Sequence, residues 1–141
     1  MTIAVHPGRL REDLAGKDIV ELGCGTAYLS AWLARREARP VAVDLSSRQL
    51  ASAARFQKEY GIRFSLVQAD AEILPLPDEG FDLAISEYGA SIWCDPYRWI
   101  PEAARVLPPS GELIFLVNGT IGCPVTCRHD VSRLHMSRGG G

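Results

Sequence analysis

The chain has 141 residues, 47% of them hydrophobic, and a formal net charge of −2, which suits one domain with its own core and excludes a second. There is no stripe of Lys and Arg to neutralise phosphates, so no nucleic-acid partner is predicted. No apolar run approaches the roughly 18 residues of a membrane span and no signal-peptide pattern is present, so we expect a cytoplasmic location. The four cysteines are typical of reduced thiols rather than a disulfide framework.

Short apolar runs alternate with amphipathic helical patterns along the chain, which predicts a parallel sheet with crossover helices. The expected strands are residues 18–22, 41–43, 63–68, 81–86 and 112–117, and the expected helices include residues 26–36 and 101–107. A further helix begins at Ser46 or Ser47 and ends at Gly61. The fold class is therefore α/β, a doubly wound Rossmann-like open sheet, mostly parallel, of about five strands.

Two close glycines, Gly23 and Gly25, follow the first strand. Neither carries a Cβ, so the backbone there can adopt positive φ and approach a ligand closely. A dinucleotide-binding loop, G-x-G-x-x-G/A, would require a small residue where this chain has Tyr28. The third small residue is Ala27 instead, whose methyl group is tolerated there if φ is negative, and we expect Thr26 to cap the following helix.

Acidic residues stand at the carboxyl ends of three predicted strands, at Glu21, Asp44 and Asp70. Ligands of open α/β sheets bind outside these strand ends, so we expect the three acids to line one crevice. Asp44 follows Gly23 by about twenty residues, the separation at which an acid accepts hydrogen bonds from a ribose diol. Any one acid alone is more typical of a surface residue that complements a helix dipole, and it is the three together that favour a ligand site.

The pattern Glu-x-Gly-x-Gly-x-Ala resembles motif I of the class I S-adenosylmethionine-dependent methyltransferases (methyltransferase domain type 11), with Ala27 in place of a third glycine. Residues 41–46 resemble motif II of that family and residues 68–77 its motif III. Residues 80–86 are similar to its fourth strand, and residues 102–113 to the helix and fifth strand that follow. The resemblance covers roughly residues 15–118.

The resemblance implies S-adenosylmethionine as the cofactor. It implies that Asp44 binds the ribose hydroxyls and that Leu45 covers one face of the adenine. It also implies that Asp70 receives the adenine amino group and that the Ala71 N–H meets a ring nitrogen. The complete set of expected cofactor-binding residues is Glu21, Gly23, Cys24, Gly25, Ala27, Asp44, Leu45, Gln49, Asp70, Ala71 and Ser86.

Transfer of a sulfonium methyl group is an in-line displacement, which depends on placing the acceptor atom more than on a nucleophilic side chain. A general base is the one further group that the reaction can use, and Glu87 and Tyr88, just after the fourth strand, are the candidates, with Asp95 as a third. Asp95 is more typical of a cap on a helix that Pro96 begins.

Aromatic residues cluster in the same segment and would form an apolar or aromatic acceptor pocket; they are Tyr88, Trp93, Tyr97 and Trp99. For Trp93 and Trp99 a place in the core is an equal alternative. The predicted partner is therefore a small-molecule acceptor, with no membrane and no nucleic acid involved.

The expected organisation is a short N-terminal segment (1–17) with room for one helix near 9–15, a cofactor-binding domain (18–118), and a disordered tail (119–141). Family members continue with strands six and seven, which this sequence does not supply. We therefore expect the fifth strand to be an exposed edge, open to self-association. Cys123, Cys127 and His129 are only three candidate ligands, whereas a zinc site usually has four, so no metal is predicted.

The predicted function is S-adenosylmethionine-dependent methyl transfer to an unidentified, small-molecule acceptor. Two alternatives stay open at this point. One is a truncated, non-catalytic domain that binds the cofactor or a partner. The other is an NAD-dependent oxidoreductase, which Tyr28 disfavours.

Overall fold

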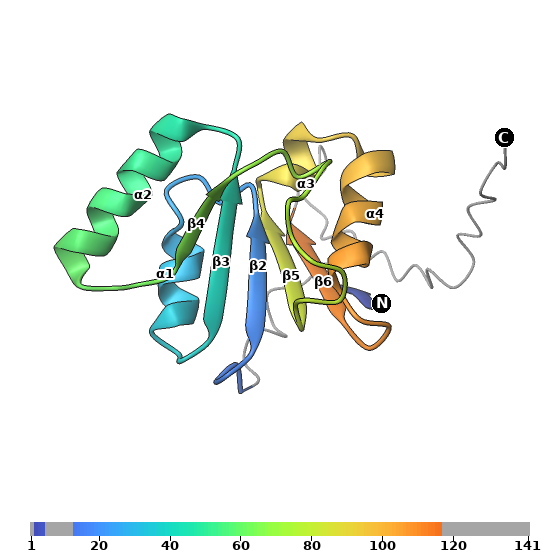
Figure 1. The fold of residues 1–141 in the computed structure, drawn as a ribbon, viewed down its shortest axis with the longest axis horizontal. Coiled ribbons are helices and arrows are strands. Elements are labelled where there is room, and N and C mark those ends of the chain that lie inside the picture. The colour runs from blue at the N-terminus through green and yellow to red at the C-terminus, as the bar shows by residue number, and fades with distance from the viewer. Residues whose placement is uncertain (1, 5–12, 117–141) are drawn as a thin grey trace, which may run out of the picture.

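The computed structural model describes residues 2–4 and 13–116. In these residues a parallel sheet carries helices on both of its faces (Figure 1). In this part of the chain the sheet has six strands in the order β1-β6-β5-β2-β3-β4, and every pairing is parallel. The strands are β1 (Thr2–Ala4), β2 (Asp18–Leu22), β3 (Arg39–Asp44), β4 (Ser65–Gln68), β5 (Leu83–Glu87) and β6 (Glu112–Leu116). The helices are α1 (Tyr28–Ala34), α2 (Ser47–Tyr60), α3 (Ala90–Trp93) and α4 (Pro96–Val106). The α/β, doubly wound fold class is confirmed.

Successive residues of the central strand β2 pack into different layers. Ile19 lies in a cluster with Leu33 of α1, while Val20 lies in a cluster with Trp99 of α4. Ala53 of α2 packs on the same side as α1. Both faces of the sheet are thus covered, which is why the central strands read as continuous apolar runs in the sequence.

Helix α2 has the predicted boundaries. Ser46 is its N-cap, and the Ser46 side chain accepts a hydrogen bond from the Gln49 N–H at 3.3 Å. Gly61 ends the helix with φ of 65°, the left-handed conformation that glycine adopts most easily.

The start of α1 differs from both expectations. The helix begins at Tyr28 with Ala27 as its N-cap, and no side chain caps it, so the assignment of Thr26 as cap is wrong. Ala27 has φ of 60° rather than a negative value. The cause is a tight turn in which the Ala27 N–H donates to the Cys24 carbonyl at 2.8 Å. A left-handed alanine costs about 1–2 kcal/mol, which explains physically why a glycine suits this position.

Helix α4 begins earlier than residue 101, at Pro96. The Asp95 carboxylate accepts a hydrogen bond from the Tyr97 N–H at 2.9 Å, so Asp95 is confirmed as a cap. Pro101 lies inside the helix.

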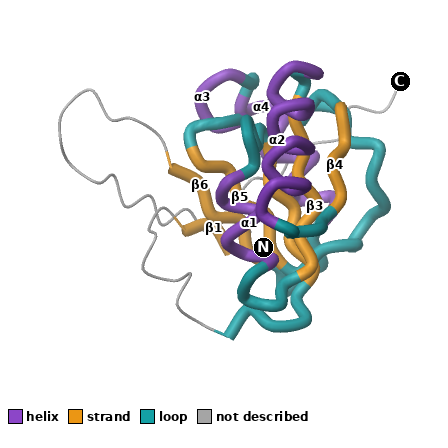
Figure 2. Tube along the Cα trace, turned by 90° about the vertical axis from the view of Figure 1, so that its left-hand side faces the viewer, coloured by secondary structure: helices purple, strands orange, loops and turns teal. Residues whose placement is uncertain are grey.

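The expected free edge at the fifth strand is also wrong, because β1 pairs with β6 (Figure 2). Residues 2–4 lie opposite residues 112–114 in this added strand. A segment of only three residues carries too little periodicity to be predicted. Residues 13–16 contain no helix, while residues 9–12 and the predicted tail at 119–141, with its cysteines and histidines, lie outside the described residues. Within residues 2–4 and 13–116, no helix has the length and apolar character needed to cross a membrane.

Two glycines meet where the loops after β2 and β5 cross. A Cβ added to Gly23 would lie 2.5 Å from the Ala90 nitrogen, and a Cβ added to Gly89 would lie 2.3 Å from the Gly23 oxygen. Real Cβ atoms do not approach so closely, so both positions require glycine. Gly23 is therefore needed for contact between two loops of the protein itself, in addition to any ligand.

We predict that Gly23→Ala lowers the free energy of unfolding more than Gly16→Ala does. Both glycines have nearly the same positive φ, 75° and 73°, but a Cβ on Gly16 would meet nothing within 4 Å. The two variants therefore share the backbone cost, and the clash adds about 1–3 kcal/mol to Gly23→Ala alone. Urea denaturation followed by circular dichroism measures the difference, and equal losses would contradict the close contact.

Candidate functional site

A crevice of about 430 Å³ opens at the carboxyl ends of the strands. The chain runs from β2 outward to β4 on one side and then to β5 and β6 on the other, so the strand order reverses beside β2. This is the point at which open α/β sheets bind ligands, and the volume is in the range of small-molecule sites. The residues that line the crevice are Gly23, Asp44, Leu45, Ser46, Ala69, Asp70, Ala71, Glu72, Gly89, Ala90, Trp93 and Cys94.

Asp44 joins the glycine loop to the start of α2. One carboxylate oxygen accepts a hydrogen bond from the Gly25 N–H at 2.8 Å, and the other accepts one from the Ser46 N–H at 2.8 Å. Each carboxylate oxygen has two acceptor sites, so Asp44 has capacity left for ligand hydroxyls. Leu45, next to it, is 68% exposed and gives the crevice an apolar wall.

Asp70 lies in the turn that follows β4. Its carboxylate accepts a hydrogen bond from the Glu72 N–H at 2.9 Å, and its carbonyl accepts one from the Ile73 N–H at 3.0 Å. The Ala69 N–H donates to the Asp44 carbonyl at 3.1 Å, so the turn is tied to the end of β3. The structure thus brings Asp44 and Asp70 to one crevice.

Glu21 has a different environment from the other two acids. It follows Ile19 by two residues in β2 and therefore points to the α1 face, where it is only 3% exposed. One of its carboxylate oxygens accepts hydrogen bonds from the Ser30 hydroxyl at 2.6 Å and the Ser30 N–H at 3.2 Å. Glu21 does not line the crevice, so the expected row of three acids is reduced to two.

Burial raises the pKa of Glu21 to about 7. The hydrogen bonds from Ser30 act in the opposite direction, and the charges of Glu87 and Asp44 raise the pKa further. The Glu21 side chain is therefore a buried, titratable group that connects β2 to α1.

Several other expected cofactor-binding residues also lie outside the crevice lining. Cys24 is buried with Ala27 against α2, and burial raises the pKa of its thiol. Ser86 is fully buried, and its hydroxyl accepts a hydrogen bond from the Ser91 N–H at 3.0 Å. Gly25 and Gln49 contribute backbone N–H groups to Asp44 and Ser46. Glu72 lines the crevice although only its neighbours in the motif III stretch were expected to, and Cys94 lines it without belonging to any of the motifs.

Glu87 pairs with a residue that sequence reasoning did not connect to it. The Tyr28 hydroxyl donates a hydrogen bond to the Glu87 carboxylate at 2.5 Å. This hydrogen bond raises the pKa of Tyr28 to about 12, so the phenol stays a proton donor. Tyr88, the other candidate base, has φ of 51° and is 47% exposed. Glu87 ends β5 and Tyr28 begins α1, and 59 residues separate the two, so no local pattern in the sequence signals the pair.

The aromatic residues divide into core and rim. Trp99 is 1% exposed and packs edge-on against Phe115 with ring centroids 5.6 Å apart, so it belongs to the core. Trp93 lines the crevice and is 83% exposed, and Tyr97 is 81% exposed. Among the described residues, no group of three or more His, Cys, Asp or Glu side chains is placed to hold a metal ion.

The parallel sheet and the crevice at its switch point define an open, doubly wound α/β protein with a ligand-sized crevice at the strand ends. Residues 20–115 match the family model described as methyltransferase domain, and the chain belongs to this family. The chain is similar to a fatty-acid O-methyltransferase of Mycolicibacterium smegmatis, with 32% identity over 112 residues, covering 78% of this chain and 40% of that protein.

Two further proteins are similar over comparable stretches. A demethylmenaquinone methyltransferase of Clavibacter sepedonicus is 33% identical over 115 residues, covering 82% of this chain and 46% of that protein. The solved structure of an S-adenosylmethionine dependent methyltransferase from Mesorhizobium loti has a TM-score of 0.66 and 29% identity, covering 77% of this chain and 50% of that one. The chain spans less than half the length of the two curated relatives.

We predict that Glu21 makes stability depend on pH. Its folded pKa of about 7 exceeds the ordinary value of 4.5, so between these pH values the folded protein holds a proton that the unfolded chain has lost. The stability contribution is present below about pH 4.5 and is lost as the pH rises through about 7, on the order of 3 kcal/mol in total.

Glu21→Gln should remove most of this pH dependence, which urea unfolding at pH 5 and pH 7.5 would measure. Glu59→Gln, at an exposed position of α2, serves as the control and should keep the wild-type dependence. A parallel pH profile for wild type and Glu21→Gln would contradict the assignment.

Proposed function

We propose that this chain forms the cofactor-binding part of an S-adenosylmethionine-dependent methyltransferase that acts on a small molecule. The observation that carries the proposal is the convergence of Asp44, Asp70 and Gly23 on one crevice at the switch point of the sheet. Membership of the methyltransferase domain family supports it.

The residues of the crevice fit the adenosine half of the cofactor. Asp44 supplies carboxylate acceptor sites for the two ribose hydroxyls, as dinucleotide-binding folds do with an acid at this position. The exposed side chain of Leu45 offers an apolar surface for the adenine ring, and Asp70 offers an acceptor for its amino group. Glu21, Cys24, Gly25, Ala27, Gln49 and Ser86 act behind this surface by shaping the loop and the strand ends.

The cofactor supplies a methyl group already activated on a sulfonium. The protein's part is to hold the acceptor atom at attack distance and to exclude water. Glu87 is the proposed base or orienting group at the acceptor side, where Tyr28 holds one of its oxygens. The exposed rings of Trp93 and Tyr97 favour an apolar or aromatic acceptor, and the fatty-acid and demethylmenaquinone methyltransferases among its relatives support a small molecule.

A non-catalytic cofactor-binding domain is the second candidate, because the chain spans less than half of its curated relatives. An NAD-dependent oxidoreductase is disfavoured by Tyr28, a large residue at the first position of α1. The cytoplasmic location stays a prediction.

Calorimetric titration of the 141-residue chain tests the cofactor. We expect micromolar binding of S-adenosylmethionine and of S-adenosylhomocysteine, with no binding of NAD under the same conditions. Binding without turnover in a screen of apolar acceptors would favour the non-catalytic alternative. Binding of NAD alone would overturn the proposal.

Asp44→Asn should weaken binding of S-adenosylhomocysteine about tenfold, since hydrogen bonds to charged groups contribute about 1.5–3 kcal/mol. Asp82→Asn is the matched control, because the Asp82 carboxylate also accepts a backbone N–H, that of Asp18 at 2.8 Å, but at the opposite end of β2. Its affinity should stay that of the wild type. Equal affinities for all three proteins would remove Asp44 from the site.

A further inference from the structure

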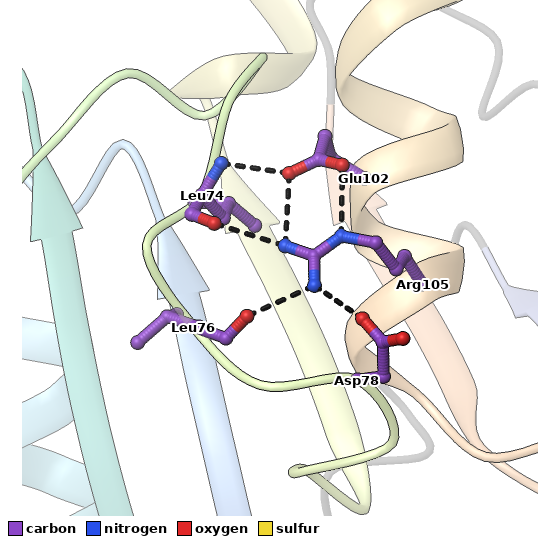
Figure 3. A network of polar contacts seen from close by, with 5 residues as sticks. All are labelled: Leu74, Leu76, Asp78, Glu102 and Arg105. Carbon is purple, nitrogen blue, oxygen red and sulfur yellow. Dashed lines mark hydrogen bonds and ion pairs between the residues drawn. The ribbon is translucent and has the colours of Figure 1, made fainter.

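The segment between β4 and β5, residues 69–82, links the crevice to helix α4. Its first part carries Asp70, Ala71 and Glu72 into the crevice lining. The rest of it runs over the sheet and lies against α4 (Figures 1 and 3). How this segment is held therefore decides where Asp70 and Ala71 stand.

Pro75 and Pro77 deprive the segment of two backbone donors, so it cannot form a regular hydrogen-bonded structure of its own. The carbonyls of Leu74 and Leu76, just before these prolines, need partners from elsewhere. Leu74 itself is 5% exposed and belongs to the core between sheet and α4.

Arg105 of α4 supplies those partners (Figure 3). One terminal nitrogen of its guanidinium donates to the Leu76 carbonyl at 2.9 Å and to the Asp78 carboxylate at 2.6 Å. The other terminal nitrogen donates to the Leu74 carbonyl at 2.9 Å. A single side chain thus holds three points of the segment.

Glu102, one turn earlier in α4, fixes the guanidinium and the segment together. Its two oxygens accept hydrogen bonds from the Arg105 Nε at 2.9 Å and from a terminal nitrogen at 3.1 Å, which is the bidentate geometry. The Glu102 carboxylate also accepts the Leu74 N–H at 2.7 Å. Both backbone groups of Leu74 are therefore bound by the Glu102–Arg105 pair.

Further contacts extend the attachment to both ends of the segment. The Glu72 carboxylate accepts the Asp95 N–H at 2.8 Å. At the other end the Glu79 N–H donates to the Arg105 carbonyl at 2.9 Å, and the Phe81 N–H donates to the Val106 carbonyl at 3.0 Å. The segment that bears Asp70 is thus attached to α4 and its cap near both of its ends, in addition to the contact of Ala69 with β3.

We propose that Arg105, together with Glu102, is a positioning pair that sets the affinity of the crevice for the adenine end of the cofactor by holding Asp70 and Ala71 in place. The inference rests on the proposed function, since the ligand is the same. Neither side chain lines the crevice, so the effect passes through the segment alone.

The test is a double-mutant cycle between Arg105→Met and Asp70→Asn, with the dissociation constant of S-adenosylhomocysteine as readout. Each single variant should weaken binding about tenfold. The double variant should be little weaker than Arg105→Met, because a displaced Asp70 has no contact left to lose. Two independent effects would multiply to about a hundredfold instead.

Arg39→Met is the matched control. Arg39 also binds a carboxylate through a guanidinium fork, that of Asp18 at 2.7 and 3.0 Å, at the opposite end of the sheet. The Arg39→Met variant should bind S-adenosylhomocysteine with wild-type affinity. Glu102→Gln gives a milder second variant should Arg105→Met fail to fold, and it should show the same non-additivity with Asp70→Asn.

The outcomes separate the two proposals. A wild-type chain that binds no S-adenosylhomocysteine overturns the proposed function and the positioning role with it. Normal wild-type binding with multiplicative losses, or with full affinity in Arg105→Met and Glu102→Gln, overturns the positioning role alone. An Asp70→Asn variant with wild-type affinity also overturns the positioning role.

Discussion

The backbone contact between Gly23 and Gly89 is the constraint on which the rest of the site depends. The loops after β2 and β5 leave adjacent strands at the point where the strand order reverses, and they cross without side chains between them. A Cβ at either position would force the loops to shift, because it would lie less than 3 Å from backbone atoms of the other loop. The crossing keeps the end of β2 next to α3, so that one wall of the crevice is backbone rather than side chain.

The acids near this crossing have distinct environments, because Glu21 lies inside β2, before its last residue Leu22, whereas Asp44 is the last residue of β3. Glu21 points into the α1 layer, where burial raises its pKa and Ser30 satisfies it. Asp44, at the end of β3, lines the crevice and organises the turn through the Gly25 N–H. One carboxylate thus supports the architecture and the other is available to a ligand, although both end apolar runs of similar sequence.

The two sides of the site are held by different layers. The proposed cofactor side combines the glycine loop with the segment that Glu102 and Arg105 attach to α4. The proposed acceptor side has Glu87 with Tyr28 of α1, and the exposed Trp93. In a methyltransferase this division makes physical sense, since one cofactor recurs with many acceptors and only the acceptor side needs to vary.

The sequence by itself determined the class of the fold and part of the crevice lining. The apolar runs, the Ser46 and Gly61 ends of α2, the Asp95 cap, and the positions of Asp44 and Asp70 all follow from local signals of propensity and spacing. Four features could not be predicted from the local sequence. They are the left-handed Ala27, the burial of Glu21, the pairing of β1 with β6, and the Tyr28–Glu87 contact. Each of these depends on which groups meet across the fold, and residues far apart in the chain leave no local pattern that would reveal such a meeting.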